Sequence, residues 1–361
     1  SRTSKSYENG HVTLIPFDPH EDIVAIARRL EPHADELSGA RLLISGGSGF
    51  LGRYFTSTLS FMNREILAKP CEIVLLDNLI TGEDSSAARE DKMITVVNHD
   101  VVKPIKLEGR FDFVIQAAGI ASPYYYRKYP LETLEVATIG TKNLLEIAKK
   151  DQARFLFFSS SEIYGDPDSN YVPTPESYRG NVSCLGPRAC YDESKRLGET
   201  LCRIYHEQYG VRSRMVRPFN VYGPGMRKID YRVLPNFAGH IVAGEPVNVY
   251  GSGNQTRTYC YISDAMVGFM KVLLDGVHGE PYNIGNPTPE ISVLELVKEI
   301  ETALGKRVDV HQMNYPDMYP ADEPNRRCPD ITKASRQLGY EPQVPLQEGP
   351  KRFLSWAHAN Y

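Results

Sequence analysis

The stretch "ACYDESKRLGE" sets a phenol and an ammonium on one face of a predicted helix: Tyr191 and, four positions later, Lys195. Residues at this spacing are neighbours along a helix surface. A phenol has a pKa of about 10 and is a poor base at neutral pH, but a nearby ammonium favours the phenolate and lowers that pKa. The pair therefore predicts a group that takes a proton from a substrate hydroxyl. A solvated helix with a chance pair is the alternative, because this pattern alone is common.

A second group of polar side chains follows a predicted strand in "RFLFFSSSEIYGDP". Ligands of open α/β sheets bind at the carboxyl ends of the strands, where we expect Ser160 and Ser161. Either hydroxyl can hold the oxygen that Tyr191 deprotonates, whereas Ser159 is better suited to capping the strand end. Glu162 comes next, and a carboxylate at the edge of a cleft is costly unless it has a role or a charged partner.

A glycine-rich turn, "GGSGFLG", follows the first predicted strand directly and contains Gly46, Gly49 and Gly52. Glycines there permit a tight turn and close backbone approach, and amides at the start of the next helix bind a pyrophosphate. We therefore expect a dinucleotide against these glycines, Phe50 and Leu51. Glycines that serve only the strand–helix turn are the alternative.

Later strand ends extend this prediction. Asp77 ends "VLLD" and is followed by Asn78; an acid at this position binds ribose hydroxyls and repels a 2′-phosphate, which favours NAD over NADP. Asp100 and Val101, in "NHDVV", are expected near the adenine, although a simple loop acid explains Asp100 equally well. The small residues against which a flat dinucleotide could lie are Ala117, Ala118 and Gly119.

The elements that must position these groups alternate along the chain from residue 41. Short apolar runs predict strands at 41–45, 72–77, 93–98, 111–118, 154–160 and 212–218. Helices are predicted over 131–150 and 191–209. This alternation predicts an α/β fold: a Rossmann-type, doubly wound parallel sheet covered by helices on both faces.

Three regions follow from the changes in pattern. Residues 1–39 form an N-terminal extension with a predicted docking helix, and 40–219 form the NAD-binding Rossmann domain. Residues 220–361 form mainly a smaller α/β substrate-binding lobe, with some elements returning to the Rossmann domain. Within this lobe the clearest helix is "ISVLELVKEIETALG", which begins with a capping-box pattern and ends at a glycine.

Composition excludes several classes of protein. The formal net charge of −4 argues against a general nucleic-acid binder, and no run of about 18 apolar residues predicts a membrane span. The N-terminus lacks the pattern of a signal peptide. The six cysteines are scattered without metal-like spacing, so we expect free thiols, a cytoplasmic protein and no metal site.

Several stretches together carry a family resemblance: "GGSGFLG", "SSSEIYGDP", "GPRACYDESKR", "RPFNVYGPGMR" and "NQTRTYCYISD". They resemble the extended short-chain dehydrogenases/reductases that act on nucleotide sugars, and within them the UDP-glucuronate decarboxylase (UDP-xylose synthase) group. The resemblance runs from about residue 40 to the C-terminus. It implies a tightly held NAD that is reduced and reoxidised within each turnover, a UDP-sugar substrate and a homodimer.

By position, the resemblance implies Tyr191 and Lys195 as the oxidation pair, with Ser160 where the family usually has threonine. Ser161 and Glu162 match the family's serine and glutamate. A further match is Arg257, at the position of an arginine linked to decarboxylation and reprotonation. The other positions implied to line the nucleotide-sugar site are Tyr126, Arg188, Asn220, Arg232, Tyr250 and Arg327. Surface salt bridges are the alternative for the arginines.

The implied chemistry follows from the substrate. Oxidation of C4 of glucuronate gives a ketone β to the C5 carboxylate, and the carbanion left by CO₂ is stabilised as an enolate. Arg257 would supply the proton to C5 or orient a water that does. Related dehydratases use an aspartate–glutamate pair as acid and base. Here Ser161 occupies the position of the aspartate, and the loss of that general acid argues against dehydration.

The sequence departs from the family pattern at three places. Ala137 stands at a usual asparagine, Gln116 replaces a common histidine, and the loop "SPYYYRKYP" is unusual, which bears on the sugar that fits. A nucleotide-sugar 4-epimerase or 4,6-dehydratase is therefore the alternative activity. A catalytically silent NAD-binding scaffold is a further alternative, which the intact tyrosine–lysine pair opposes.

Overall fold

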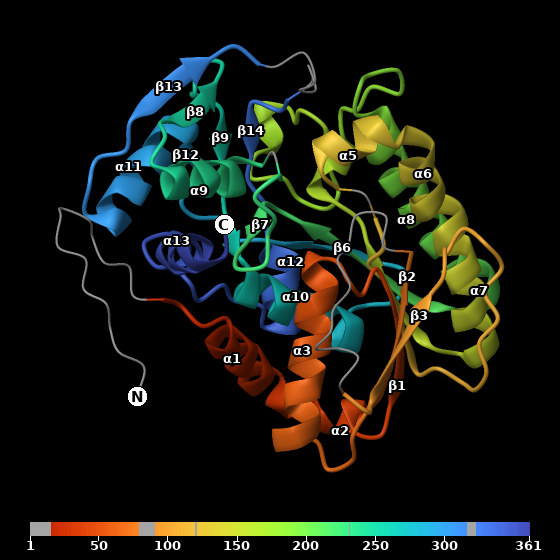
Figure 1. Ribbon diagram of the computed structural model, residues 1–361. Coiled ribbons are helices and arrows are strands. Elements are labelled where there is room, and N and C mark those ends of the chain that lie inside the picture. The colour runs from red at the N-terminus through yellow and green to blue at the C-terminus, as the bar shows by residue number, and fades with distance from the viewer. Residues whose placement is uncertain (1–15, 79–90, 120, 231, 316–322) are drawn as a thin grey trace, which may run out of the picture.

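The computed structural model describes residues 16–78, 91–119, 121–230, 232–315 and 323–361. Within them, the centre of the molecule is a seven-stranded sheet in the order β11-β6-β5-β4-β1-β2-β3 (Figure 1). All its pairings are parallel. Its strands are β1 (Arg41–Ser45), β2 (Glu72–Asp77), β3 (Ile94–Asn98), β4 (Phe113–Gln116), β5 (Arg154–Phe158), β6 (Arg212–Pro218) and β11 (Pro281–Ile284).

The six strands predicted from apolar runs all form. Five of them are largely buried between layers of helices, whereas β3, at the edge of the sheet, is partly exposed. β11 was not predicted as part of this sheet; it comes from the C-terminal third and pairs with β6 along Met215–Pro218. The order reverses between β1 and β4, so the crevice at their carboxyl ends is the expected ligand site.

Helices cover both faces of the sheet (Figure 1). One face carries α3 (Phe50–Glu65) and α10 (Ile262–Asp275), with α12 (Thr332–Leu338) beside α10. The other carries α6 (Pro130–Glu135), the π-helix η2 (Val136–Gly140), α7 (Thr141–Asp151) and α8 (Ala189–Tyr209). The helix predicted over 131–150 is therefore a helix interrupted by one π-helical segment.

Short elements connect these layers near the crevice. They are α5 (Pro123–Lys128), η3 (Ser161–Tyr164) and η4 (Ser169–Tyr171).

The C-terminal lobe lies over the carboxyl end of the sheet (Figure 1). Its strands are β7 (Val221–Tyr222), β8 (Val247–Tyr250), β9 (Thr256–Arg257), β10 (Cys260–Tyr261), β12 (Ile291–Ser292), β13 (Val310–Met313) and β14 (Arg326–Arg327). Its helices are α9 (Val233–Ala243), α11 (Val293–Leu304) and α13 (Gly349–Asn360). The predicted capping box of α11 is confirmed, with Ser292 and Glu295 bonded reciprocally and Gly305 in the left-handed conformation.

The described part of the N-terminal extension is a helix packed on the body, as predicted. α1 (His20–Leu30) contacts α3 and α10 and continues through η1 (Glu31–His33) into α2 (Ala34–Leu37). The buried Asp22 carboxylate accepts a hydrogen bond from the Tyr261 hydroxyl at 2.6 Å and pairs with Arg352 at 3.2 Å. None of the helices in the described ranges has the length and apolar character needed to cross a bilayer.

Candidate active site

The glycine turn between β1 and α3 is shaped for close approach. Gly46 has a φ of +74°, and a Cβ on it would lie 2.7 Å from backbone atoms of Ala118. A Cβ on Gly52 would lie 2.4 Å from the Gly46 carbonyl oxygen. Gly49 precedes the first turn of α3 and lines a cavity of about 140 Å³, together with Phe50. The turn therefore packs tightly inward and presents a helix N-terminus outward, which fits the diphosphate of NAD.

The acid at the end of β2 lies beside this turn. One carboxylate oxygen of Asp77 accepts a hydrogen bond from the Ser48 amide at 2.9 Å, and Asn78 is exposed next to it. Asp77 is thus held near the helix N-terminus, in the place from which a ribose could be bound.

The structure gives less direct support to the two predicted adenine contacts, Asp100 and Val101. An Asp100 oxygen accepts from the Val102 amide at 3.0 Å, while Val101 is buried in the sheet's core. The residues after β4 lie closer to the crevice: Ala117 and Gly119 line a cavity of about 240 Å³. We describe this cavity as the active-site cavity.

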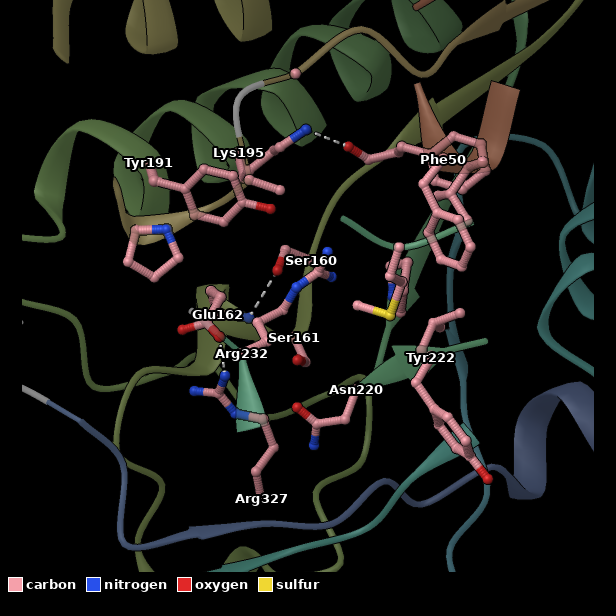
Figure 2. Close-up of a pocket in the computed structure, with 18 of the residues that line it drawn as sticks. Phe50, Ser160, Ser161, Glu162, Tyr191, Lys195, Asn220, Tyr222, Arg232 and Arg327 are labelled. Atoms are coloured by element: carbon pink, nitrogen blue, oxygen red, sulfur yellow. Dashed lines mark hydrogen bonds and ion pairs between the residues drawn. The ribbon is translucent and has the colours of Figure 1, made fainter. Parts of the chain in front are cut away.

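The tyrosine–lysine pair lies on α8 facing the active-site cavity (Figure 2). The Tyr191 ring stacks on Tyr126 with ring centres 5.5 Å apart. The Lys195 ammonium donates to the Phe158 carbonyl at 2.7 Å and lies 5.7 Å from the centre of the Tyr191 ring. Both side chains are buried, so this is not the solvated helix of the alternative interpretation.

The expected lowering of the Tyr191 pKa is wrong for this structure. Burial raises the pKa of the phenol to about 12, although a hydrogen bond with Ser160 opposes the rise. Burial also lowers the pKa of the Lys195 ammonium to about 8. The spacing on the helix is as predicted, but desolvation by burial is the main cause of the pKa shift in both groups.

The serine prediction is corrected in one detail. Ser160, not Ser159, caps the next element, since its Oγ accepts from the Glu162 amide at 3.1 Å at the start of η3. The Ser159 hydroxyl is buried and has no hydrogen-bond partner among the described residues. The Ser159, Ser160 and Ser161 side chains all line the active-site cavity.

Glu162 finds the charged partners that its position requires. Its carboxylate forms close ion pairs with Arg188 and with Arg327. These guanidinium groups hold the pKa of Glu162 at about 2, against the effect of burial. Glu162 is therefore ionised at neutral pH. Figure 2 shows it extended toward Arg327, below Tyr191 and Ser160.

One residue of this charged cluster was missed by the sequence reasoning. Glu323 lines the active-site cavity and bridges two arginines, with its oxygens 2.9 Å from Arg188 and 2.6 Å from Arg257. It lies in an irregular proline-rich stretch whose pattern distinguishes no acid from another. Only the folded structure brings it to the arginines.

The remaining predicted substrate residues divide into two groups. Tyr126, Asn220 and Arg232 line the active-site cavity with the arginines already named. Tyr250 does not; it stacks on Tyr315 beside a smaller cavity that shares Arg257 and Glu323.

The departures at Gln116 and Ala137 are packing features. The buried Gln116 amide donates to the Val136 carbonyl at 3.0 Å and to the Thr141 hydroxyl at 3.2 Å, and its oxygen accepts from Ser45. Gln116 thus joins the end of β4 to η2, in which Ala137 is buried.

The fold and the site together define a nucleotide-dependent enzyme of the Rossmann class, and comparison with known proteins identifies its family. The model of the NAD dependent epimerase/dehydratase family matches residues 42–285. The chain therefore belongs to this family, and its cofactor is NAD.

Similar proteins narrow the comparison. UDP-glucuronic acid decarboxylase 5 of Arabidopsis thaliana is 40% identical over 315 residues, which cover 86% of this chain and 87% of the relative. UDP-glucuronic acid decarboxylase 1 of Xenopus tropicalis is 40% identical over 318 residues, which cover 88% of this chain and 72% of the relative. The dTDP-glucose 4,6-dehydratase DesIV of Streptomyces venezuelae, solved with NAD and TYD bound, is 27% identical with a TM-score of 0.76, covering 89% of this chain and 97% of DesIV.

Proposed function

We propose that this protein is an NAD-dependent UDP-glucuronate decarboxylase that forms UDP-xylose through a transient 4-keto sugar. The similarity to UDP-glucuronic acid decarboxylases over most of the chain supports it. The observation that carries the proposal is the composition of the active-site cavity. A tyrosine–serine pair for alcohol oxidation lies beside Glu162 and four arginines that suit an anionic sugar nucleotide.

The oxidation step needs a base at the C4 hydroxyl. NAD bound against the glycine turn would supply the acceptor for the C4 hydride and the donor for its return. We assign the proton to Tyr191, with Ser160 bonded to the same oxygen. Lys195 is the positive charge that can stabilise the phenolate, because its ammonium lies 5.7 Å from the Tyr191 ring centre and both side chains are buried. We assign the cofactor contacts to the glycine turn, to Asp77 and to the residues that follow β3 and β4.

The decarboxylation step needs little beyond the ketone itself, since the electrons of the broken C–C bond move into the enolate. We assign Arg257 to the carboxylate side of the sugar and to the return of a proton to C5, directly or through a water. Arg188 and Arg327 are assigned to substrate anions, together with Asn220, Arg232 and Tyr126. Tyr250 is assigned to the outer part of the site.

Dehydration is disfavoured by the state of the acidic groups. Loss of water from C6 needs a general acid, and Ser161 stands where dehydratases have that acid. Glu162 cannot replace it while two arginines keep it ionised.

We further infer a cytoplasmic homodimer. The described cysteines are all free thiols, which suits a reducing compartment. Large apolar side chains are exposed on α6, η2 and α8 at Leu131, Leu134, Ile139, Leu197 and Ile204. Their grouping on adjacent helices of one face suits contact with a second copy. Residues 40–219 are assigned to NAD binding and 220–361 mainly to substrate binding.

The test is a product analysis of the purified protein with UDP-glucuronate and NAD. We expect release of CO₂ and formation of UDP-xylose, which NMR and mass spectrometry detect. A UDP-uronate of unchanged mass would instead identify a 4-epimerase, and conversion of a nucleotide hexose to a 4-keto-6-deoxy sugar would identify a dehydratase.

A further inference from the structure

The arginines of the active-site cavity are already paired within the protein. Arg188 and Arg257 share the carboxylate of Glu323, at 2.9 and 2.6 Å, and Arg188 and Arg327 share that of Glu162. The side chains of Arg188, Arg257 and Arg327 are only 4 to 8% exposed. These three arginines share two carboxylates, so an anionic ligand must replace an existing ion pair to reach one of their guanidinium groups.

The two carboxylates differ in how firmly the chain holds them. Glu162 lies in η3, directly after β5, and its amide is bonded to the Ser160 cap. Glu323 lies in irregular backbone before β14 and is followed by Pro324, which has no amide to donate. The nearest backbone contact on that side is at Asn325, whose amide donates to Asp166 at 3.0 Å. Glu323 is thus the carboxylate that can withdraw without breaking a helix or a strand.

The chemistry of the bridge matches one part of the substrate. Glu323 offers two guanidinium groups a single carboxylate, and the sugar of UDP-glucuronate also carries a single carboxylate. Exchange of one for the other preserves both charge-assisted contacts. A UDP-sugar without a carboxylate offers nothing that restores those contacts at the sugar end.

We propose that the carboxylate of Glu323 is an internal competitor of the substrate, which holds Arg188 and Arg257 until the carboxylate of the substrate sugar replaces it. This rests on the proposed function for the identity of the sugar. Glu323 makes the arginine pair unavailable to neutral sugars and lowers the affinity for UDP-glucuronate by competing with it.

The test compares binding, not turnover. Calorimetric titrations with UDP-glucuronate and with UDP-xylose use the NAD-loaded protein carrying Tyr191→Phe to prevent reaction, with and without Glu323→Gln. We expect Glu323→Gln to tighten UDP-glucuronate binding by about tenfold, as loss of a competing ion pair of about 1.4 kcal/mol would do. UDP-xylose binding should change by less than about twofold.

Glu290→Gln is the matched control. It removes the same charge from the same lobe, where Glu290 pairs with Arg326 at 2.7 Å outside the active-site cavity. It should leave both affinities unchanged. Glu323→Ala provides a second variant if the amide itself disturbs the arginines, and circular dichroism reports whether each variant is folded.

Two outcomes would overturn the proposal. Weaker UDP-glucuronate binding in both Glu323 variants would show that Glu323 supports the arginines in their binding positions. An equal gain for UDP-glucuronate and UDP-xylose would show that Glu323 competes with the diphosphate and not with the carboxylate of the sugar. Failure of the wild-type protein to decarboxylate UDP-glucuronate would refute the proposed function separately, because the affinity difference is measured without turnover.

Discussion

At the scale of single residues, the central feature is a buried phenol that needs help to ionise. The sequence spacing predicts Tyr191 and Lys195 on one face of α8, and the structure agrees. It places the two groups in a setting where burial moves their pKa values apart, to about 12 and about 8. Spacing can be read from the sequence; burial depends on what α8 packs against.

The role of the phenol gives the first prediction. Tyr191→Phe should lower kcat for UDP-glucuronate by about 10²- to 10⁴-fold, the usual effect of removing a general base, with little change in affinity for UDP. Steady-state kinetics and calorimetry measure the two quantities. Tyr209→Phe, at the exposed end of the same helix, should retain activity. Comparable activity in the Tyr191 and Tyr209 variants would remove Tyr191 from the chemistry.

The second prediction concerns a tyrosine beside Arg257. Tyr259 lines the active-site cavity, is 8% exposed, and its hydroxyl has no hydrogen-bond partner among the described residues. Tyr259→Phe should therefore stabilise the ligand-free protein by about 1 kcal/mol, because an unsatisfied buried hydroxyl is removed. Urea unfolding measures this change. A loss of stability would mean that the hydroxyl is satisfied in solution.

The contrast between Glu162 and Glu323 shows why part of the charged cluster escaped prediction. Glu162 follows a strand and a serine run, so its position at the cleft could be inferred from the pattern. Glu323 lies in a proline-rich stretch far along the chain, where nothing in the sequence indicates which acid meets Arg188 and Arg257.

At the scale of elements, the strands were the most predictable feature. All six predicted apolar runs form strands, and five of them are buried within the sheet, whereas β3 is a partly exposed edge strand. β11 escaped assignment to this sheet because strand pairing across 60 or so residues leaves no local pattern. The division of the 131–150 helix by η2 also has no local sign, since Gln116 supports it from β4.

The third prediction concerns the buried Asp22 carboxyl group, which joins α1 to the rest of the protein. Burial raises the pKa of Asp22 from 3.8 to about 6, in spite of Tyr261 and Arg352. The folded protein then binds this proton more tightly than the unfolded chain, so acidification from pH 7 to pH 5 adds stability through this group. Relative to Asp22→Asn, the wild type should gain about 1 kcal/mol over that interval.

Urea unfolding of both proteins at the two pH values provides the measurement. Because every other carboxylate is shared, the difference between the curves isolates Asp22. A stability difference that is the same at pH 7 and pH 5 would contradict the raised pKa.

At the scale of the whole molecule, the ligand crevice could be inferred in advance. The reversal of strand order between β1 and β4 brings the glycine turn, Asp77 and the residues after β4 to one edge, and α8 adds Tyr191 there. The contacts that hold the N-terminal docking helix could not be inferred, since Asp22 meets partners that lie more than 200 residues later in the chain.

The fourth prediction concerns assembly. Leu134 in α6 is 40% exposed and belongs to the group of exposed apolar side chains on α6, η2 and α8. Leu134→Glu should shift sedimentation from dimer to monomer, because a desolvated charge opposes contact between copies. Val277→Glu, after α10 on the opposite face, is the control and should remain dimeric. A monomeric wild-type protein would contradict the proposed homodimer.

The most direct test of the central claim follows the hydrogens of the sugar. UDP-glucuronate deuterated at C4 is converted in ordinary water, and unlabelled UDP-glucuronate is converted in D₂O, with the UDP-xylose examined by NMR. If the same C4 hydrogen is removed and returned while the C5 proton comes from solvent, the first product retains deuterium at C4 and the second gains one at C5. Loss of the C4 label to solvent, or a product that keeps the carboxylate, would contradict the account.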